Sequence, residues 1–306
     1  MRLALVFDKA REDTIGGYFE RACRQLGVAY DHFWTSRSHE IPAGYDLYLR
    51  IDHGDYRADL PDHLSPKIFL ATDTHLKNPW RQVRRLAPRY DLVCCVHHDG
   101  ARALQNGAWV PVACDLELHR GGQKPQRWAL VCVGTEGGVP RKFYLQALRE
   151  RYPNSFLGHA PSTELGALYS QGRIGFNYSI RNEINMRVFE VLCSGTFLLT
   201  NRLDQNDLAS LGLHEGEHLV SYERPKELFE KIDWYLHHED ERRVMAEAGM
   251  RQVQQHHTYA HRLTQILALA ESRLGVRVAA SILKASDNMV VARGSRLDAE
   301  GKSLEP

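Results

Sequence analysis

The chain contains 306 residues, of which 25% are charged and 43% are hydrophobic, and its formal net charge is +1. This ordinary composition excludes a disordered, collagen-like or coiled-coil chain, and at about 150 residues per domain the length predicts two domains. The balanced charge argues against bulk binding of nucleic acid, which needs a clustered excess of basic side chains to displace phosphate counterions. A small anion bound at one local site remains compatible with it.

The first residues, MRLALVF, contain a short apolar run that charged residues follow directly. This run is too short for the apolar core of a signal peptide and far too short for a spanning helix, so it predicts a buried first strand. The six cysteines lack C-x-x-C spacing and lie mostly in apolar runs, which is typical of reduced, buried thiols. We therefore expect a cytoplasmic protein without a transmembrane segment.

Short apolar runs alternate with amphipathic segments through the first half of the chain, up to a linker at 114–127 that is rich in glycine, proline and charge. Strands separated by helices imply right-handed crossovers and a mainly parallel sheet. We place this first, Rossmann-like domain at 1–118. Its expected strands are 3–7, 45–50, 67–72, 91–96 and 108–112, and its expected helices are 15–27, 79–87 and 99–106.

The same alternation restarts after the linker and ends in three successive amphipathic helices. It predicts a second Rossmann-like domain at 128–272 with a helical C-terminal end, followed by a partly flexible tail at 275–306. The fold class is therefore α/β with two parallel sheets. The expected strands of the second domain are 128–134, 155–158, 173–179, 196–200 and 218–222, and its expected helices are 139–151, 162–170, 184–194, 225–237, 239–254 and 258–273.

The helix expected at 184–194 carries an apolar face and, opposite to it, a narrow polar stripe whose members are three or four residues apart. The stripe is either a solvated face with an ion pair between Arg187 and Glu190, or the wall of a ligand site, because parallel sheets bind ligands where strands end and helices begin. At such a place Glu190 can accept hydrogen bonds from two ribose hydroxyls, and Arg187 can meet phosphate oxygens. The loop before the helix adds polar groups, among them Asn177 and Asn182.

Five short motifs follow one another in the second half: NMRVFEVLCSGTFLLT, EGEHLVSY, KELFEKIDWYL, ERRVMAEAG and HHTYAHRL. In this order they resemble the spore-maturation (CgeB-like) proteins, which are relatives of the group 1 nucleotide-sugar glycosyltransferases. The resemblance covers 130–272 and is weaker over 1–113. It implies a GT-B fold, with two facing Rossmann-like domains, the donor bound mainly by the C-terminal one and the acceptor by the N-terminal one.

The resemblance also implies roles for individual residues on the donor side. Glu190 matches the carboxylate that binds the nucleotide ribose, and Asn185 and Arg187 match the N-x-R pattern that precedes it. Gly134 matches the glycine that closes the first strand of the donor domain.

Two further positions follow from the same resemblance. Arg141 or Lys142 is placed to meet the diphosphate of the donor. The larger group carries a second glutamate before the ribose-binding one, but here that position is Asn182, and Glu183 lies one residue away. Either Asn182 contacts the sugar or the donor is handled differently, so retaining chemistry is not implied.

Candidates for a general base lie in the first domain. Asp73 follows the strand expected at 67–72 and His98 follows the strand at 91–96, so both lie where a site forms in a parallel sheet. Either side chain can deprotonate an acceptor hydroxyl as it attacks the anomeric carbon. Alternatively, Asp73 caps the helix expected at 79–87 or the turn before it.

We therefore expect a metal-independent, hexosyltransferase-like glycosyltransferase that moves a sugar from a nucleotide diphosphate sugar to an acceptor hydroxyl in the interdomain cleft, with no further cofactor. The sequence lacks D-x-D and C-x-x-C spacings, and helix dipoles and basic side chains can offset the leaving diphosphate instead. The acceptor, a glycan, lipid, protein or small molecule, stays open. Two alternatives remain: a non-catalytic nucleotide-sugar-binding or scaffold protein, and a GT-B nucleotide-sugar epimerase or hydrolase.

Overall fold

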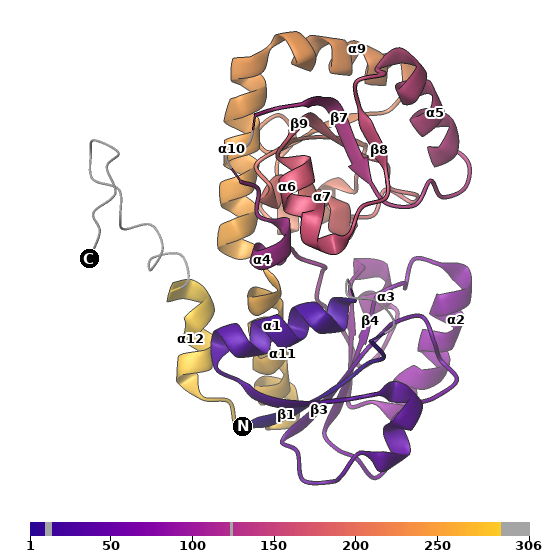
Figure 1. Cartoon of the computed structure of the whole chain (residues 1–306). Helices are drawn as coiled ribbons and strands as arrows, with labels where there is room; N and C mark the ends of the chain where they lie inside the picture. Colours follow the sequence, from indigo (N-terminus) through magenta and orange to yellow (C-terminus); the bar gives the residue numbers. More distant parts are fainter. Residues whose placement is uncertain (10–13, 123–124, 289–306) are drawn as a thin grey trace, which may run out of the picture. The chain divides into compact units, whose positions relative to one another are not determined.

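The computed structural model describes residues 1–9, 14–122 and 125–288. The chain divides into two compact units, of which the first combines Met1–Val110 with Tyr259–Pro306 and the second spans Pro111–Thr258 (Figure 1). Each unit is built around one parallel β-sheet.

The first unit contains a six-stranded sheet in the order β2-β1-β3-β4-β5-β6, and every neighbouring pair is parallel. Strands β3, β4 and β5 are buried along their whole length, as expected for a sheet covered by helices on both faces. The sequence pattern does not predict β2, because its sequence AYDHF is polar and it lies half-buried at the sheet edge. The strands are β1 (Arg2–Val6), β2 (Ala29–Phe33), β3 (Leu47–Ile51), β4 (Lys67–Ala71), β5 (Leu92–Cys95) and β6 (Gly107–Trp109).

The helices of the first unit begin with α1, whose N-cap Thr14 accepts a hydrogen bond from the Gly17 backbone N–H at its Oγ1 (3.4 Å). A Cβ atom on Gly16 would lie 2.2 Å from the Phe7 ring, so this glycine serves close packing of helix on strand. The helices are α1 (Ile15–Leu26), α2 (Lys77–Leu86), α3 (His98–Arg102), α11 (Tyr259–Leu274) and α12 (Ala280–Asn288), with short 3-10 helices at Thr35–Glu40 and Ala87–Arg89.

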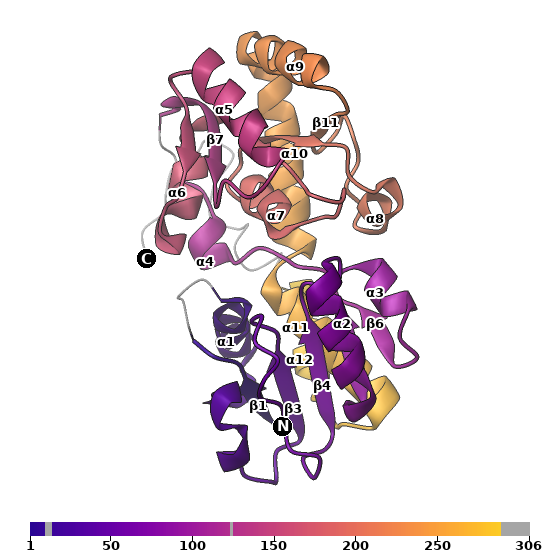
Figure 2. The ribbon, with the colours of Figure 1, turned by 90° about the vertical axis from the view of Figure 1, so that its right-hand side faces the viewer.

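Helix α11 belongs to the first unit, whereas the sequence pattern places it in a second domain that ends at 272. It packs on α1 (Figure 2), where the rings of Tyr18 and Tyr259 stack with their centroids 4.8 Å apart. Gln265 Nε2 also donates a hydrogen bond to the Trp109 carbonyl oxygen (3.0 Å). An amphipathic pattern shows that a helix buries one face, but it does not show which sheet receives that face. The end of the tail, predicted to be flexible, lies outside the described residues.

The second unit contains a five-stranded parallel sheet in the order β11-β10-β9-β7-β8. All five strands that the alternation predicts are present. They are β7 (Trp128–Val133), β8 (Phe156–Gly158), β9 (Gly172–Asn177), β10 (Phe197–Asn201) and β11 (Val220–Tyr222). The main helices around them are α5 (Arg141–Arg151), α6 (Leu165–Tyr169), α7 (Met186–Cys193), α8 (Gln205–Ser210), α9 (Pro225–His237) and α10 (Glu239–His256), with a 3-10 helix at Ser162–Glu164.

The segment expected to be a linker instead contains a short helix, α4 (Leu116–His119), that packs in the second unit against α6 and α7. Asp115 caps this helix, because its Oδ1 accepts hydrogen bonds from the backbone N–H groups of Glu117 and Leu118. The Cys114 N–H donates to the His257 carbonyl oxygen (2.9 Å), which ties the segment to the end of α10. A helix of one turn is too short to show a hydrophobic period, so the composition alone suggests a linker.

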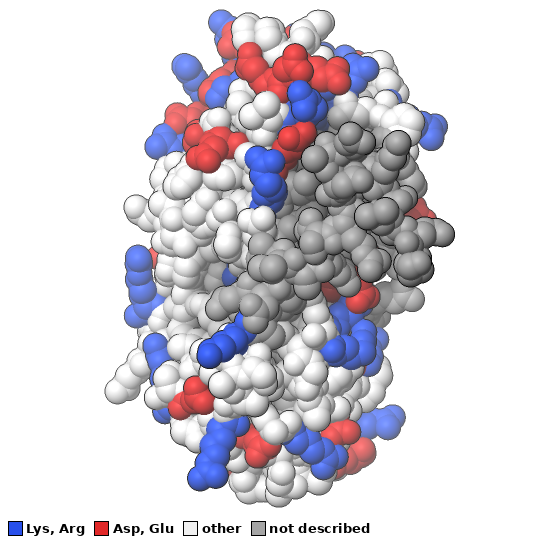
Figure 3. All heavy atoms as spheres, turned by 90° about the vertical axis from the view of Figure 1, so that its left-hand side faces the viewer, with Lys and Arg blue, Asp and Glu red and all other residues white. Residues whose placement is uncertain are grey.

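The cysteines are all buried free thiols, as predicted. Burial, above all, raises the pKa of Cys23 and of Cys95 to about 12, so these thiols stay protonated. On the described part of the face drawn in Figure 3, basic and acidic side chains are interspersed. Within the described ranges, no helix combines the length and the apolar character that a membrane crossing requires.

We predict that Tyr259→Ala destabilises the first unit and leaves the amide hydrogens of the second unit protected from exchange. The Tyr259 ring is 3% exposed and stacks on α1. Removing a buried aromatic side chain costs about 3–5 kcal/mol. Hydrogen exchange measured by mass spectrometry should accelerate in α1 and β1. The control Phe143→Ala, which changes an exposed ring on α5, should accelerate neither. Faster exchange confined to the helices of the second unit would contradict the placement of α11.

Candidate functional site

Four of the residues predicted to bind the donor lie together at the carboxyl edge of the second sheet. Gly134 directly follows β7, Asn177 ends β9, and Asn185 and Arg187 lie at the start of α7. Because β7 and β9 are parallel neighbours, their ends meet at one edge of the sheet. Helix α7, which follows β9, therefore brings its first turn to the same edge.

Arg187 connects the ends of these two strands. Its Nε donates a hydrogen bond to the Val133 carbonyl oxygen (2.9 Å), and its Nη1 donates to Asn177 Oδ1 (3.3 Å). A Cβ atom on Gly134 would lie 2.3 Å from Arg187 Nη2, and Gly134 has a φ of +137°, so only glycine fits beside this guanidinium. Both hydrogen-bond acceptors are neutral, and no ion pair to Arg187 is found in the described part of the chain.

Asn177 is fully buried, and its amide binds three neighbouring side chains. Its Nδ2 donates to Thr200 Oγ1 (3.0 Å) on β10, and its Oδ1 accepts from Asn185 Nδ2 (3.2 Å) as well as from Arg187. Asn185 Oδ1, in contrast, is buried without a hydrogen-bond partner. Asn177 therefore positions its neighbours, whereas Asn185 keeps an acceptor for a ligand.

Arg141 brings a second guanidinium to this edge from the start of α5. Its Nη2 donates to the Tyr178 carbonyl oxygen (2.7 Å), and its buried Nε has no hydrogen-bond partner. Burial, and then the positive charge of Arg187, lower the pKa of Arg141, although an arginine remains protonated. An anion bound to both guanidiniums would offset their repulsion. Lys142 is exposed and forms no hydrogen bond or ion pair through its side chain among the described residues.

Glu190 is buried, 7% exposed, on the same helix as Arg187. The alternative of a solvated helix face with an ion pair between Arg187 and Glu190 is therefore wrong. Glu190 is buried, and no hydrogen bond or ion pair from a described residue reaches its carboxylate. Burial raises the pKa of Cys132 at the end of β7, and Arg187 and Arg141 lower it. The negative charge of Glu190 raises the pKa of Cys132, so the Glu190 carboxylate lies near the end of β7. Against the effect of burial, Glu190 also raises the pKa of Arg187, and the Glu190 carboxylate keeps its hydrogen-bonding capacity for ligand hydroxyls.

Asn182, the position that departs from the family pattern, lies in the loop between β9 and α7. Asn182 has a φ of 58°, a left-handed conformation that asparagine adopts more readily than glutamate. Its Oδ1 accepts a hydrogen bond from Asn201 Nδ2 (3.3 Å). Glu183 accepts hydrogen bonds from Ser179 Oγ (2.6 Å) and from the Arg181 N–H (2.7 Å), which fold the loop onto itself. Glu183 therefore orders the loop.

Asp73 lies two residues after the end of β4 in the first unit and is half-buried. Its backbone oxygen accepts from the Leu76 N–H (3.0 Å), but the residue that caps α2 is Leu76, and no side chain caps this helix. Asp73 therefore does not cap α2, although its backbone oxygen closes the turn before this helix. Burial, and then the negative charge of Asp52, raise the pKa of the Asp73 carboxyl, and His75 lowers it. A raised pKa brings this carboxylate nearer to the range that suits a general base.

The histidine that faces the turn after β4 is His97 rather than His98. The His98 ring stacks on Trp109 with the centroids 3.7 Å apart. The His97 ring lies 4.4 Å from His75, and its Nδ1 forms a hydrogen bond with Thr74 Oγ1 (3.0 Å). No group of three or more His, Cys, Asp or Glu side chains suited to a metal ion is found in the described ranges.

Asp52 is a further carboxylate at the carboxyl edge of the first sheet, and the sequence pattern does not predict it. It is buried where β3 ends, and it accepts hydrogen bonds from the Gly54 N–H (2.9 Å), Tyr56 Oη (2.8 Å) and the Thr72 N–H (3.2 Å). A usable signal was present, because Asp52 follows the expected strand 45–50 just as Asp73 follows the next one. His97 precedes His98 directly, and a sequence alone does not show which member of a doublet faces inward.

The chain is similar to the β-glucosyltransferase of phage T4 in complex with UDP-glucose, at 12% identity and a TM-score of 0.57, with 91% of this chain and 100% of that chain covered. It is also similar to Anabaena Alr3699/HepE in complex with UDP and glucose, at 11% identity and a TM-score of 0.59, covering 89% of this chain and 100% of that chain. A third similar structure is TarM of S. aureus, at 10% identity and a TM-score of 0.56, covering 72% of this chain and 55% of that chain.

These likenesses define the class of fold: the chain has the GT-B fold of glycosyltransferases, as predicted, with two parallel-sheet Rossmann-like units. Residues 120–268, which include most of the second unit, match the model of the family described as Glycosyl transferase-like. A search of curated protein sequences finds no match.

We predict that Gly134→Ala destabilises the protein by about 1–3 kcal/mol, because the new Cβ meets Arg187 Nη2 and the backbone has a positive φ. The matched control is Gly138→Ala in the same loop, where nothing lies within 4 Å of the new Cβ. It should change stability by less than about 0.5 kcal/mol. Denaturant unfolding compares the two variants, and equal losses would contradict the close approach of Arg187.

We also predict that Asp52→Asn lowers the pKa of the Asp73 carboxyl, because it removes the neighbouring negative charge that raises this pKa. Carbon-detected NMR titration of the side-chain carboxyl measures it. The control Asp99→Asn removes an exposed charge on α3 and should leave the Asp73 pKa unchanged. An Asp73 pKa that stays the same or rises in Asp52→Asn would contradict the coupling.

Proposed function

We propose that this protein is a glycosyltransferase that moves a sugar from a nucleotide diphosphate sugar to an acceptor hydroxyl. The observation that carries the proposal is the arrangement of two guanidiniums, Arg141 and Arg187, beside the unpartnered carboxylate of Glu190 at one sheet edge. The match to the Glycosyl transferase-like family and the fold shared with proteins crystallised with UDP or UDP-glucose support it. The motif order supports the CgeB-like group in particular.

The donor roles follow from the chemistry of each side chain. Glu190 accepts hydrogen bonds from the two ribose hydroxyls, which a carboxylate binds in a bidentate manner. Arg141 and Arg187 bind the diphosphate, and Gly134 leaves room for the Arg187 guanidinium beside the strand end. Asn185 offers its buried Oδ1 to a donor group of the ligand. Together these groups distinguish a nucleoside diphosphate from a simple anion.

In the transfer step the acceptor oxygen forms a bond to the anomeric carbon while the bond from that carbon to the diphosphate oxygen breaks. The electron pair leaves with the nucleoside diphosphate, and its negative charge is stabilised by the two guanidiniums. The acceptor proton passes to a base, for which Asp73 in the first unit is our candidate. Because fixed positive charges are already present at the donor edge, we propose that transfer needs no metal ion. The six buried free thiols support a cytoplasmic location.

We predict that the protein binds one of UDP, GDP, dTDP or CMP and that Glu190→Gln weakens this binding by about 10- to 100-fold. The reason is the loss of a charged hydrogen-bond acceptor while the shape of the side chain is kept. Isothermal titration calorimetry measures the affinity. The control Glu164→Gln changes an exposed glutamate and should leave the affinity unchanged.

The same titrations, followed by incubation with the matching nucleotide sugar and analysis of the products, separate the candidate functions. Failure of all four nucleotides to bind would contradict the donor site. Binding without transfer to any acceptor would favour a nucleotide-sugar-binding protein without catalytic activity. Release of free sugar or a change of the sugar itself would indicate a hydrolase or an epimerase.

A further inference from the structure

A surface cavity of about 850 Å³ opens in the first unit between the loop after β3 and helix α2. Its volume lies in the range of about 300–1,000 Å³ that is typical of pockets for small molecules. The residues that line it are Gly54, Asp55, Tyr56, Arg57, Arg81, Gln82 and Arg85. We call it the arginine cavity, because three guanidiniums line it against a single carboxylate.

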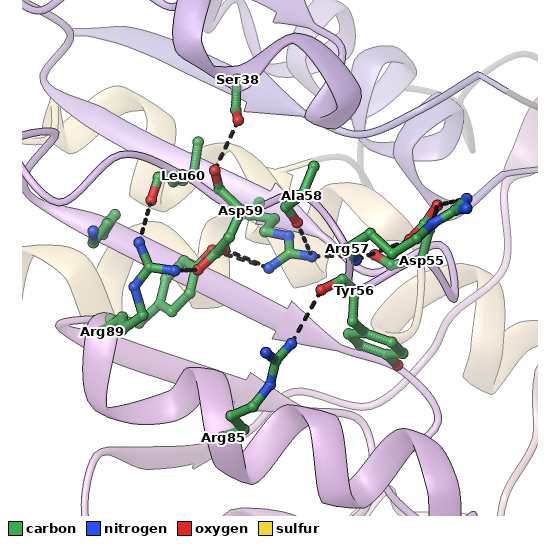
Figure 4. Close-up of polar contacts among 12 residues, drawn as sticks. Ser38, Asp55, Tyr56, Arg57, Ala58, Asp59, Leu60, Arg85 and Arg89 are labelled. Atoms are coloured by element: carbon green, nitrogen blue, oxygen red, sulfur yellow. Dashed lines mark hydrogen bonds and ion pairs between the residues drawn. The ribbon is translucent and has the colours of Figure 1, made fainter.

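Two of these guanidiniums keep their charge available. The Asp55 carboxylate is bound by Arg57, with Oδ2 2.5 Å from Nη2 (Figure 4). Arg85 donates from Nη2 to the Tyr56 carbonyl oxygen (3.2 Å), a neutral acceptor that fixes the side chain without neutralising it. Arg81 is exposed and has no hydrogen bond or ion pair through its side chain within the described chain. Arg81 and Arg85 are four residues apart on α2, so they share one helix face.

The wall opposite α2 is held in place from inside the unit. Arg50 is fully buried, and its Nη2 donates to the carbonyl oxygens of Asp55 and Ala58 (both 3.2 Å). Its Nη1 is 2.5 Å from Asp59 Oδ1, and Arg89 binds the other oxygen of the same carboxylate (2.6 Å). These contacts order the loop from 55 to 59, and the two arginines neutralise the negative charge of Asp59 (Figure 4). The cavity therefore presents a preformed, positively charged surface.

Tyr56 links the arginine cavity to the candidate base. Its Oη donates to Asp52 Oδ2 (2.8 Å), and Asp52 raises the pKa of Asp73. The Thr72 N–H donates to the same Asp52 oxygen (3.2 Å), which connects the loop to the end of β4. One chain of contacts thus joins the cavity wall to the turn that carries Asp73, within a single unit.

We infer that the arginine cavity binds a phosphate group on a sugar-sized acceptor. Guanidinium groups bind phosphate oxygens through paired hydrogen bonds, and a neutral sugar would leave the charges of Arg81 and Arg85 without a partner. The inference rests on the proposed function, which it deepens by naming the acceptor class.

The test compares Arg81→Gln with Arg84→Gln, which removes the same charge from the same helix. Arg84 lies over the Trp80 ring and does not line the cavity. Binding of inorganic phosphate, glucose 6-phosphate, glucuronate and glucose is measured by calorimetry at low ionic strength. Glucose 6-phosphate should bind the unmodified chain and glucose should not. Arg81→Gln should weaken glucose 6-phosphate at least about tenfold, and Arg84→Gln should leave its affinity within about twofold.

Three results would overturn the inference: no binding of either phosphate probe, equal losses in the two variants, or tighter binding of glucuronate than of glucose 6-phosphate. Titration of UDP, GDP and dTDP into the same variants separates this inference from the proposed function. Nucleotide affinity should not change in Arg81→Gln. If no nucleotide binds to any sample, the unmodified chain included, the donor site is contradicted. If the unmodified chain binds a nucleotide but not glucose 6-phosphate, only the arginine cavity is contradicted.

Discussion

The guanidinium of Arg187 joins the carboxyl ends of β7 and β9, and the donor edge of the second unit is organised around it. Charge-assisted hydrogen bonds of this kind contribute about 1.5–3 kcal/mol each. The contact requires a glycine at position 134 and a buried amide at Asn177. It leaves a positive charge facing Arg141, near the unpartnered carboxylate of Glu190. A ligand with phosphates and hydroxyls that binds these groups in the folded state should therefore stabilise the folded protein.

The first unit uses a buried arginine at a similar place with a different outcome. Arg50 lies in β3 near its carboxyl end, and its guanidinium binds the carboxylate of Asp59 as well as backbone oxygens. Its charge is therefore neutralised, so it orders a loop. Arg187 binds a carbonyl and an amide oxygen, and its charge remains. The charge of the partner thus distinguishes a structural arginine from one suited to bind an anion.

The sequence predicts those features that depend on local order. Buried strands, the helix after β9 and the donor residues within it are close together in the chain, so periodicity and motif spacing reveal them. Features made by distant segments are not visible in this way. An amphipathic pattern in α11 does not identify α1 as its partner, and the arginine cavity combines Arg57 with Arg81 from separate elements. The burial of Glu190 was also hidden, because a polar stripe on a helix is usually solvated.

The central claim is that the two guanidiniums at the donor edge form the binding site of the diphosphate. It is tested most directly by comparing the affinities of the preferred nucleoside diphosphate and of its parent nucleoside in Arg141→Gln. We predict that the diphosphate weakens at least about tenfold while the nucleoside changes less than about twofold, because only the former meets the guanidiniums. Equal losses for both ligands, or no loss for the diphosphate, would contradict the claim.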